Sequence, residues 1–376
     1  MAETPLRVGI VGANPDYGWG SGVHRRIVTM LPGVTLHGVC TTKAETAERA
    51  AREFGAALAF TDAAALAAHP EIDIVAICVR APHHYAIARD ALLNGKHVYC
   101  EWPLAFTIEQ AEELAALAAD RGCKAMIGLH LRGSPELRYA ADLIRDGFIG
   151  RPYSINLCAR VYGPTTAAMA TRAGGTTLLS IYGGHLLDAI DHHFGGIRSF
   201  GARSAIHLPP VDQQGAPVAR DAPDHYVVQG ELGSGALFNF DLAGTSVAAM
   251  GSTWRIEGTG GSLMLTTADP AMPAMEVLSM SGRSGGGEWK PLTVPAAYDC
   301  AAIPPTPDRY PAYPTTPASR FALVSIGTLY GRLRDAIVQD GPVEPDFARA
   351  AAIQRLLDAV DRDQSIECPV ALGAAA

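Results

Sequence analysis

The residues best suited to acid–base chemistry lie near the middle of the chain, where His and Asp recur at helical spacing. Four residues at positions i, i+4, i+7 and i+11 share one face of a predicted helix: Ile181, His185, Asp188 and His192. A neutral imidazole can accept a proton from a hydroxyl group, and its conjugate acid can return one to a carbonyl group. His185 is therefore a candidate catalytic residue and Asp188 a candidate substrate contact, although a His and an Asp on one helical face can equally form a structural pair.

Tyr182 is the alternative proton donor in this segment. An unperturbed phenol has a pKa of about 10, so Tyr182 would need a nearby cation such as Arg80 or Arg132 to act near neutral pH. The adjacent pair His192 and His193 lacks a third ligand at suitable spacing, and we predict no metal site.

A glycine-rich loop, residues 12–22, follows the first predicted strand and has the sequence GANPDYGWGSG. In the dinucleotide-binding fingerprint GxGxxG, glycines let the main chain approach a pyrophosphate at a helix N-terminus. Asn14 replaces the second glycine, and Asn tolerates the left-handed conformation better than most residues do. The loop is longer than the fingerprint and could be a plain connector, but its position favours a cofactor contact through Gly12, Asn14 and Trp19.

The end of the second predicted strand bears on the choice of cofactor. NAD enzymes commonly place a carboxylate there, which binds the ribose hydroxyls and repels a 2′-phosphate. This chain has Thr41, Thr42 and Lys43 instead. Hydroxyls and an ammonium group suit NADP slightly better, while NAD stays open because a Lys at a helix start can simply be solvated.

Strands and helices alternate through the first third of the chain. Short apolar runs at 7–11, 35–40, 72–79, 97–100 and 124–129 are separated by stretches with helical periodicity. This alternation predicts a doubly wound parallel sheet, which we assign to a dinucleotide-binding domain over residues 1–128. His130 and Arg132 follow the last of these strands, where open parallel sheets bind ligands, and are candidate substrate contacts; a surface pair is the alternative.

The remainder, residues 129–376, is expected to form a second α/β domain. Alternating segments at 153–160, 226–232, 236–242 and 262–265 predict a large, mostly antiparallel open sheet. We expect loops at 281–287 and 301–317, and helices at 325–339 and 347–361 that can pack back on the first domain. One face of the sheet is predicted to be too apolar to stay exposed, which favours a homodimer or homotetramer.

Composition excludes several classes of protein. The 376 residues are 48% hydrophobic and 18% charged, and the net charge of −8 argues against nucleic-acid or anionic-membrane partners. We expect a cytoplasmic protein, because the sequence has no secretion signal and no 18-residue apolar stretch. Its seven cysteines lack zinc-ligand spacing and are expected to be reduced thiols.

Several segments together resemble the Gfo/Idh/MocA oxidoreductases: residues 12–24, 72–79, His84, GKHVYCEWP at 95–103, 132–135, 147–150 and 183–185. The resemblance implies an N-terminal Rossmann domain and a C-terminal α/β domain whose open sheet mediates oligomerisation. It also implies hydride transfer between NAD(P) and a sugar, polyol or other cyclic alcohol or ketone. By the same resemblance, further cofactor contacts are Val79, Arg80, His84 and Glu101.

The sequence departs from this family at two positions involved in proton transfer. The family's EKP motif places a lysine beside the nicotinamide, and Trp102 stands there; Trp102 could stack on the nicotinamide or line the substrate pocket. The family also places an Asp four residues before its His, and this chain has Ile181 there. Of the family's Lys, Asp and His, only the His remains, as His185. These departures resemble the branch that contains the yeast galactose-regulon repressor.

Two functions follow from this comparison. The first is an NAD(P)-dependent oxidoreductase with atypical proton handling, acting on a small polyhydroxylated substrate. The second is a catalytically silent, cofactor-bound sensor or regulator that binds a sugar or a protein. We favour the enzyme, because hydride chemistry belongs mainly to the cofactor and the protein has only to position a C–H bond and one proton.

Overall fold

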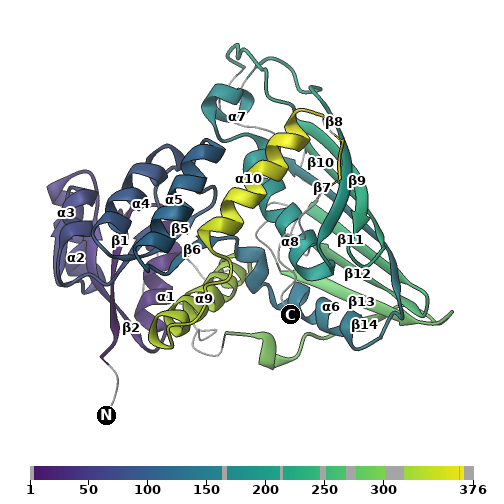
Figure 1. The fold of residues 1–376 in the computed structure, drawn as a ribbon, viewed down its shortest axis with the longest axis horizontal. Helices are drawn as coiled ribbons and strands as arrows, with labels where there is room; N and C mark the ends of the chain where they lie inside the picture. Colours follow the sequence, from purple (N-terminus) through teal and green to yellow (C-terminus); the bar gives the residue numbers. More distant parts are fainter. Residues whose placement is uncertain are drawn as a thin grey trace. The chain divides into compact units, whose positions relative to one another are not determined.

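The computed structural model describes residues 4–162, 167–211, 215–245, 251–267, 277–300, 317–363 and 365–367. The chain divides into two compact units (Figure 1). The first comprises Met1–Gly133 and Cys300–Ala351, and the second comprises Ser134–Asp299 and Ala352–Ala376.

The first unit contains a six-stranded sheet in the order β3-β2-β1-β4-β5-β6, and all its pairings are parallel. Its strands are β1 (Leu6–Val11), β2 (Val34–Cys40), β3 (Leu58–Phe60), β4 (Ile74–Ile77), β5 (His97–Glu101) and β6 (Ala125–Gly128). This confirms the predicted doubly wound sheet. Strands β1 to β3 are added toward one edge of the sheet and β4 to β6 toward the other, so the order of the strands reverses between β1 and β4. Ligands of such folds bind at this point, at the carboxyl ends of the strands.

The helices of this unit are η1 (Gly20–His24), α1 (Arg25–Met30), α2 (Ala44–Phe54), α3 (Ala63–Ala68), η2 (Ala81–His83), α4 (His84–Leu93), α5 (Ile108–Asp120), η3 (His130–Gly133) and α9 (Pro317–Val338). Capping explains several boundaries: the Thr107 hydroxyl accepts the amide N–H of Gln110 at the start of α5. Helix α9 begins earlier than the predicted residue 325 and lies beside α1 (Figure 1). Helix α10 (Phe347–Asp361) follows and has the predicted bounds.

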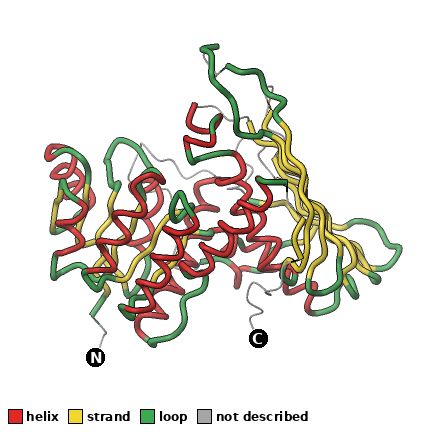
Figure 2. The backbone as a smooth tube through the Cα atoms, turned by 45° about the horizontal axis from the view of Figure 1, so that its top comes forward, coloured by secondary structure: helices red, strands yellow, loops and turns green. Residues whose placement is uncertain are grey.

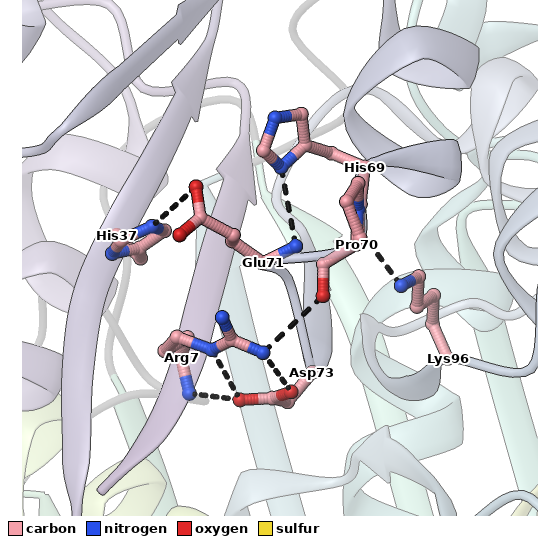
Figure 3. Close-up of polar contacts among 7 residues, drawn as sticks. All are labelled: Arg7, His37, His69, Pro70, Glu71, Asp73 and Lys96. Atoms are coloured by element: carbon pink, nitrogen blue, oxygen red, sulfur yellow. Dashed lines mark hydrogen bonds and ion pairs between the residues drawn. The ribbon is translucent and has the colours of Figure 1, made fainter.

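A cluster of hydrogen bonds and ion pairs links the amino-terminal ends of neighbouring strands in this sheet (Figure 3). Arg7 at the start of β1 donates to the Asp73 carboxylate from Nε and NH2, at 3.0 and 2.9 Å, and to the carbonyl of Pro70. Lys96 donates to the carbonyl of His69 at 2.8 Å. Burial alone would raise the pKa of Asp73, but the hydrogen bonds and charge of Arg7 lower it. The cluster sets where β1 and β4 start, and thus where their carboxyl ends lie at the opposite edge.

The second unit contains a nine-stranded sheet in the order β14-β13-β12-β11-β7-β10-β9-β8-β15. Only β10 and β7 pair in parallel, and the other pairings are antiparallel, which confirms the predicted mostly antiparallel sheet. The strands are β7 (Pro152–Tyr162), β8 (Ile197–Ala205), β9 (His225–Leu232), β10 (Leu237–Thr245), β11 (Gly251–Gly258), β12 (Gly261–Thr267), β13 (Leu278–Ser284), β14 (Lys290–Leu292) and β15 (Ser365–Glu367).

The helices of the second unit are α6 (Pro135–Arg145), α7 (Ala167–Ala170), η4 (Arg172–Gly174), η5 (Leu179–Gly183), α8 (Gly184–Phe194) and η6 (Ala296–Tyr298). Helices α6 and α8 lie on one face of the sheet (Figures 1 and 2). Phe194 at the end of α8 packs against Trp254 of β11, with ring centroids 6.0 Å apart. This packing sets the orientation of α8, which carries His185.

The other face of this sheet differs from the prediction. Its partly or fully exposed side chains, which alternate with buried ones, are mainly polar among the described residues: Ser154, Asn156, Arg160, Gln229, Asn239, Asp241, Thr253 and Arg255. Leu237, Val227, Met264 and Cys158 are less polar members of the same face. The expectation of an apolar face was therefore wrong, and a dimer or tetramer remains an expectation from the family resemblance alone.

The predicted loop at 281–287 was also partly wrong, because Ser281–Ser284 belongs to β13. Gly282 suggested a loop, but a Cβ there would lie 2.8 Å from Leu292 and 2.9 Å from the Phe148 ring, so close packing accounts for this glycine. The other predicted loop, 301–317, lies outside the described residues up to position 316.

Candidate functional site

The glycine loop crosses the carboxyl ends of β1, β2 and β4. The amide N–H groups of Gly12 and Ala13 donate to the carbonyl of Cys40, at 3.0 and 3.2 Å. Gly12 has a φ of +98°, and a Cβ there would lie 2.4 Å from the carbonyl oxygen of Cys78. Only glycine satisfies both the left-handed backbone and this close approach.

Gly20 belongs to the predicted glycine loop but was not among the cofactor contacts named from the sequence. It begins the continuous helical segment formed by η1 and α1, and a Cβ at Gly20 would lie 2.5 Å from the carbonyl oxygen of Gly12. The absence of a side chain at Gly20 therefore lets the start of the helix pack closely against the loop and the end of β4, which is the role of the last glycine of the fingerprint. Among the described residues, no side chain caps this helix and no acidic residue occupies its first turn. The amide N–H of Gly22 donates to the carbonyl of Gly18, and the amides of Gly20 and Ser21 before it are suited to a phosphate.

Asn14 does not use the left-handed conformation that Asn tolerates, since its φ is not positive. Its side chain instead forms a turn, in which Oδ1 accepts the amide N–H of Asp16 at 2.9 Å. Its carbonyl oxygen accepts the hydroxyl of Ser21 at 2.5 Å. Asn14 therefore shapes the loop through hydrogen bonds, and Trp19, the residue before η1, packs against the apolar core.

The three residues that follow β2 differ in their roles. Thr41 is buried, and its hydroxyl lies 3.0 Å from the carbonyl of Lys43 and 2.6 Å from the hydroxyl of Thr46. Thr42 and Lys43 are exposed. The hydroxyl of Thr41 thus helps begin α2, while Lys43 carries the ammonium group available at this strand end.

Glu101 ends β5 and lies within a buried polar cluster. Its Oε1 is 3.1 Å from Nε2 of His24, whose Nδ1 is 2.8 Å from the hydroxyl of Tyr330 on α9. The Tyr330 ring stacks on Tyr99, with centroids 4.4 Å apart. Burial, together with the charge of Glu101, raises the pKa of both phenols well above their ordinary value, so they remain protonated donors. His24 and Tyr330, which the sequence analysis missed, hold Glu101 in place.

His84 is buried, and main-chain oxygens lie close to both of its ring nitrogens. Nδ1 is 2.7 Å from the carbonyl of Pro103, and Nε2 is 2.9 Å from the carbonyl of Val79. A neutral imidazole donates to one of these and an imidazolium to both. His84 therefore ties the end of β4 to the segment after β5, while the neighbouring Arg80 is exposed.

The structure buries all four residues that the sequence assigned to substrate, of which Asp188 lies on α8 and the other three follow strands of the first unit. Trp102 is buried after β5, and His130 and Arg132 are buried in η3. The His130 ring meets Phe321 edge-on, and Arg132 forms an ion pair with Glu344. Through these contacts η3 packs against α9 and the segment that follows it. The spacing of residues in the sequence did not indicate this packing role.

The acid–base candidates of the second unit lie on η5 and α8. His185 and Asp188 are buried, whereas Tyr182 and Ile181 are partly exposed. The wider π-helical turn of η5 separates Ile181 from His185, so the uniform helical face expected from i, i+4 spacing begins only at Gly184. Burial raises the pKa of Tyr182, and the phenol therefore stays protonated at neutral pH.

The predicted site residues therefore form two groups. Those assigned to cofactor follow the carboxyl ends of strands in the six-stranded sheet, and Tyr182, His185 and Asp188 share a helical segment in the second unit. Among the described residues, no group of three His, Cys, Asp or Glu side chains is placed to hold a metal ion. No helix in the described part of the chain is long and apolar enough to span a membrane.

Comparison with family models identifies both parts of the chain. Residues 6–129 match the model "Oxidoreductase family, NAD-binding Rossmann fold", and residues 137–264 match the GFO/IDH/MocA C-terminal domain. The chain belongs to the GFO/IDH/MocA oxidoreductase family. The first of these models covers the glycine loop, Lys43, His84 and Glu101, and the second covers His185.

Individual members of the GFO/IDH/MocA family show moderate similarity. The chain is 30% identical to dehydrogenase aclE of Aspergillus oryzae over 61% of its length, and 27% identical to the galactose/lactose metabolism regulatory protein GAL80 of Saccharomyces cerevisiae over 61%. It is 29% identical to D-glucoside 3-dehydrogenase of Escherichia coli over 54%. The matches span 67%, 59% and 59% of those proteins. A levoglucosan dehydrogenase structure with NADH and levoglucosan shares the fold, with a TM-score of 0.76 at 20% identity, covering 98% of this chain and all of that one.

Proposed function

We propose that this protein is an NAD(P)-dependent oxidoreductase that interconverts a hydroxyl and a carbonyl group on a sugar, polyol or other cyclic alcohol. The observation that carries the proposal is the junction of Gly12 and Gly20, which brings an uncapped helix N-terminus to the carboxyl ends of β1 and β4. The name of the D-glucoside 3-dehydrogenase relative supports a carbohydrate substrate.

The residues present fit a dinucleotide. The loop amides and the start of η1 would hold the pyrophosphate, and Glu101, fixed by His24, would orient the nicotinamide end. When bound, the nicotinamide supplies the hydride acceptor or donor. The chain itself has to bind and orient the substrate, and to move one proton at the substrate oxygen.

We assign that proton to His185. Its imidazole would take the proton of the substrate hydroxyl during oxidation and return it during reduction. Trp102 cannot titrate, so the family lysine has no replacement at its own position. Tyr182 retains its proton and would act as a hydrogen-bond donor to the substrate oxygen.

Two measurements test the proposal. Titration of the full chain with NADH and NADPH should show binding, and incubation with a panel of sugars and polyols should yield substrate-dependent reduction of the oxidised cofactor. His185→Ala should lower turnover by roughly 10²–10⁴ while cofactor affinity changes little. His193→Ala, the same change on the same helix, serves as the matched control. Full activity in His185→Ala would contradict the assignment.

A regulatory protein is the second candidate, favoured by Trp102 and Ile181 and by the similarity to GAL80. The double variant Trp102→Lys, Ile181→Asp separates the two functions. If the scaffold is a silenced enzyme, restoring the family residues should raise dehydrogenase activity on sugars. If Trp102 lines the pocket of a working enzyme, the added charge should lower activity instead.

A further inference from the structure

The glycine loop carries a carboxylate that the sequence analysis did not consider. Gly12 and Gly20 are separated by eight positions, whereas the first and third glycines of GxGxxG are separated by five. The extra length includes Asp16, which is 61% exposed at its side chain. Because Gly12 and Ala13 are bonded to the last residue of β2, the loop that carries Asp16 begins directly over that strand end.

Two contacts fix Asp16 there. Its amide N–H donates to Oδ1 of Asn14, and its carboxylate accepts a hydrogen bond from NH2 of Arg49, which lies on α2. Helix α2 starts immediately after β2, so the Asp16–Arg49 ion pair links the glycine loop to the helix that follows this strand. The pair joins residues 33 positions apart in the sequence.

The groups around this strand end have opposite preferences for a phosphate. The main-chain carbonyl of Lys43 accepts hydrogen bonds, but its ammonium group forms no hydrogen bond or ion pair with any residue that the structure describes, and its charge favours an anion. Arg49 would add a second cation with the planar donor geometry that suits phosphate, but its guanidinium pairs with Asp16 and, at 3.9 Å, with Glu53 on the same helix. A carboxylate in this region accepts hydrogen bonds from ribose hydroxyls and repels a 2′-phosphate.

We infer that Asp16 supplies, from the lengthened glycine loop, the ribose-binding carboxylate that β2 lacks, and that it makes the protein prefer NAD(H) to NADP(H). The inference rests on the proposed dinucleotide function and reverses the slight preference for NADP that Lys43 alone suggested. It also gives a role to the replacement of the second glycine, since Asn14 forms the turn that presents Asp16.

The test compares the dissociation constants of NADH and NADPH, measured at one fixed ionic strength, for the wild type and for Asp16→Asn. The wild type should bind NADH more tightly. Asp16→Asn keeps the size of the side chain but removes the ion pair with Arg49 and leaves only the longer contact with Glu53 at 3.9 Å, so NADPH should bind about tenfold to a hundredfold more tightly relative to NADH. Asp16→Glu should keep the preference of the wild type.

Two further variants show that the effect is local. Adding Arg49→Gln to Asp16→Asn should remove most of the gain in NADPH affinity, because the freed guanidinium is then absent. Asp120→Asn removes the same charge from the end of α5, next to the loop that leads into β6, and should leave the ratio unchanged.

The outcomes distinguish this inference from the proposed function. If the wild type prefers NADPH, or if Asp16→Asn changes the ratio by less than about twofold, Asp16 does not discriminate, although dinucleotide binding stands. If neither dinucleotide binds to the wild type or to the variants, the proposed function fails and the inference fails with it.

Discussion

The contact between Gly20 and Gly12 makes a quantitative test of the cofactor loop possible. In Gly20→Ala, the new methyl group would lie 2.5 Å from the carbonyl oxygen of Gly12 and 3.0 Å from its carbon. Unstrained contacts begin near 3.5 Å, so the loop must move by about 1 Å. The atoms in the way belong to the main chain, which cannot turn aside as a flexible side chain would.

The expected cost follows from this displacement. Overpacking costs about 1–3 kcal/mol, and the gain in helix propensity returns about 1 kcal/mol, so the variant should lose up to about 2 kcal/mol of stability. A displacement of about 1 Å at a binding loop can cost on the order of a hundredfold. We therefore expect the dissociation constant for NADH to rise by about tenfold to a hundredfold.

Gly331→Ala is the matched control. Gly331 lies inside α9, and apart from its chain neighbours and its own helical turn no described residue has an atom within 4 Å of the position that a Cβ would take, so the same substitution should stabilise the fold by up to about 1 kcal/mol. Cofactor titration and thermal unfolding of both variants provide the measurements. The interpretation of the glycine loop is wrong if Gly20→Ala binds NADH as tightly as the wild type does.

Three other predictions concern the surroundings of the site. The Arg7–Asp73 pair lowers the pKa of Asp73, so it stabilises the fold above the unfolded-state pKa of about 3.9 and loses this effect as pH falls. In thermal unfolding, the melting temperature of Asp73→Asn should lie below that of the wild type at pH 7 and equal it in acid. Tyr330→Phe keeps the ring on Tyr99 but leaves Nδ1 of His24 without its partner, and should cost about 1–3 kcal/mol in denaturant unfolding; a neutral result would refute the role of this bond. The family resemblance predicts that the wild type sediments as a dimer or tetramer at micromolar concentration and that Leu237→Glu, on the uncovered sheet face, shifts it toward monomer; a monomeric wild type would rule this out.

The sequence predicted those parts of the fold that depend on local pattern. Apolar runs located five of the six strands of the parallel sheet, and the short edge strand β3 was not predicted. Strand β11 was missed although buried Trp254 and Ile256 alternate with exposed Thr253 and Arg255, a pattern typical of a strand covered on one face. Gly282 suggested a loop because its packing against Phe148 depends on residues far away in the sequence.

The site could be predicted only in part, because its decisive contacts join distant segments. Spacing and family resemblance marked Gly12, Glu101 and His185. Neither could indicate that Tyr330 reaches His24 across 306 positions, or that Arg49 pairs with Asp16. Such contacts depend on how α9 and α2 pack, and no local pattern records that packing.

Isotope transfer tests the central claim most directly. The full chain is incubated with NAD⁺ and with sugars or polyols deuterated at their carbinol carbons, and the nicotinamide is then analysed by mass spectrometry. The proposed function predicts that deuterium moves to the nicotinamide from at least one substrate, and that His185→Ala slows the transfer while His193→Ala does not. Tight binding of cofactor and sugar with no deuterium transfer from any substrate would contradict an oxidoreductase and identify a sensor.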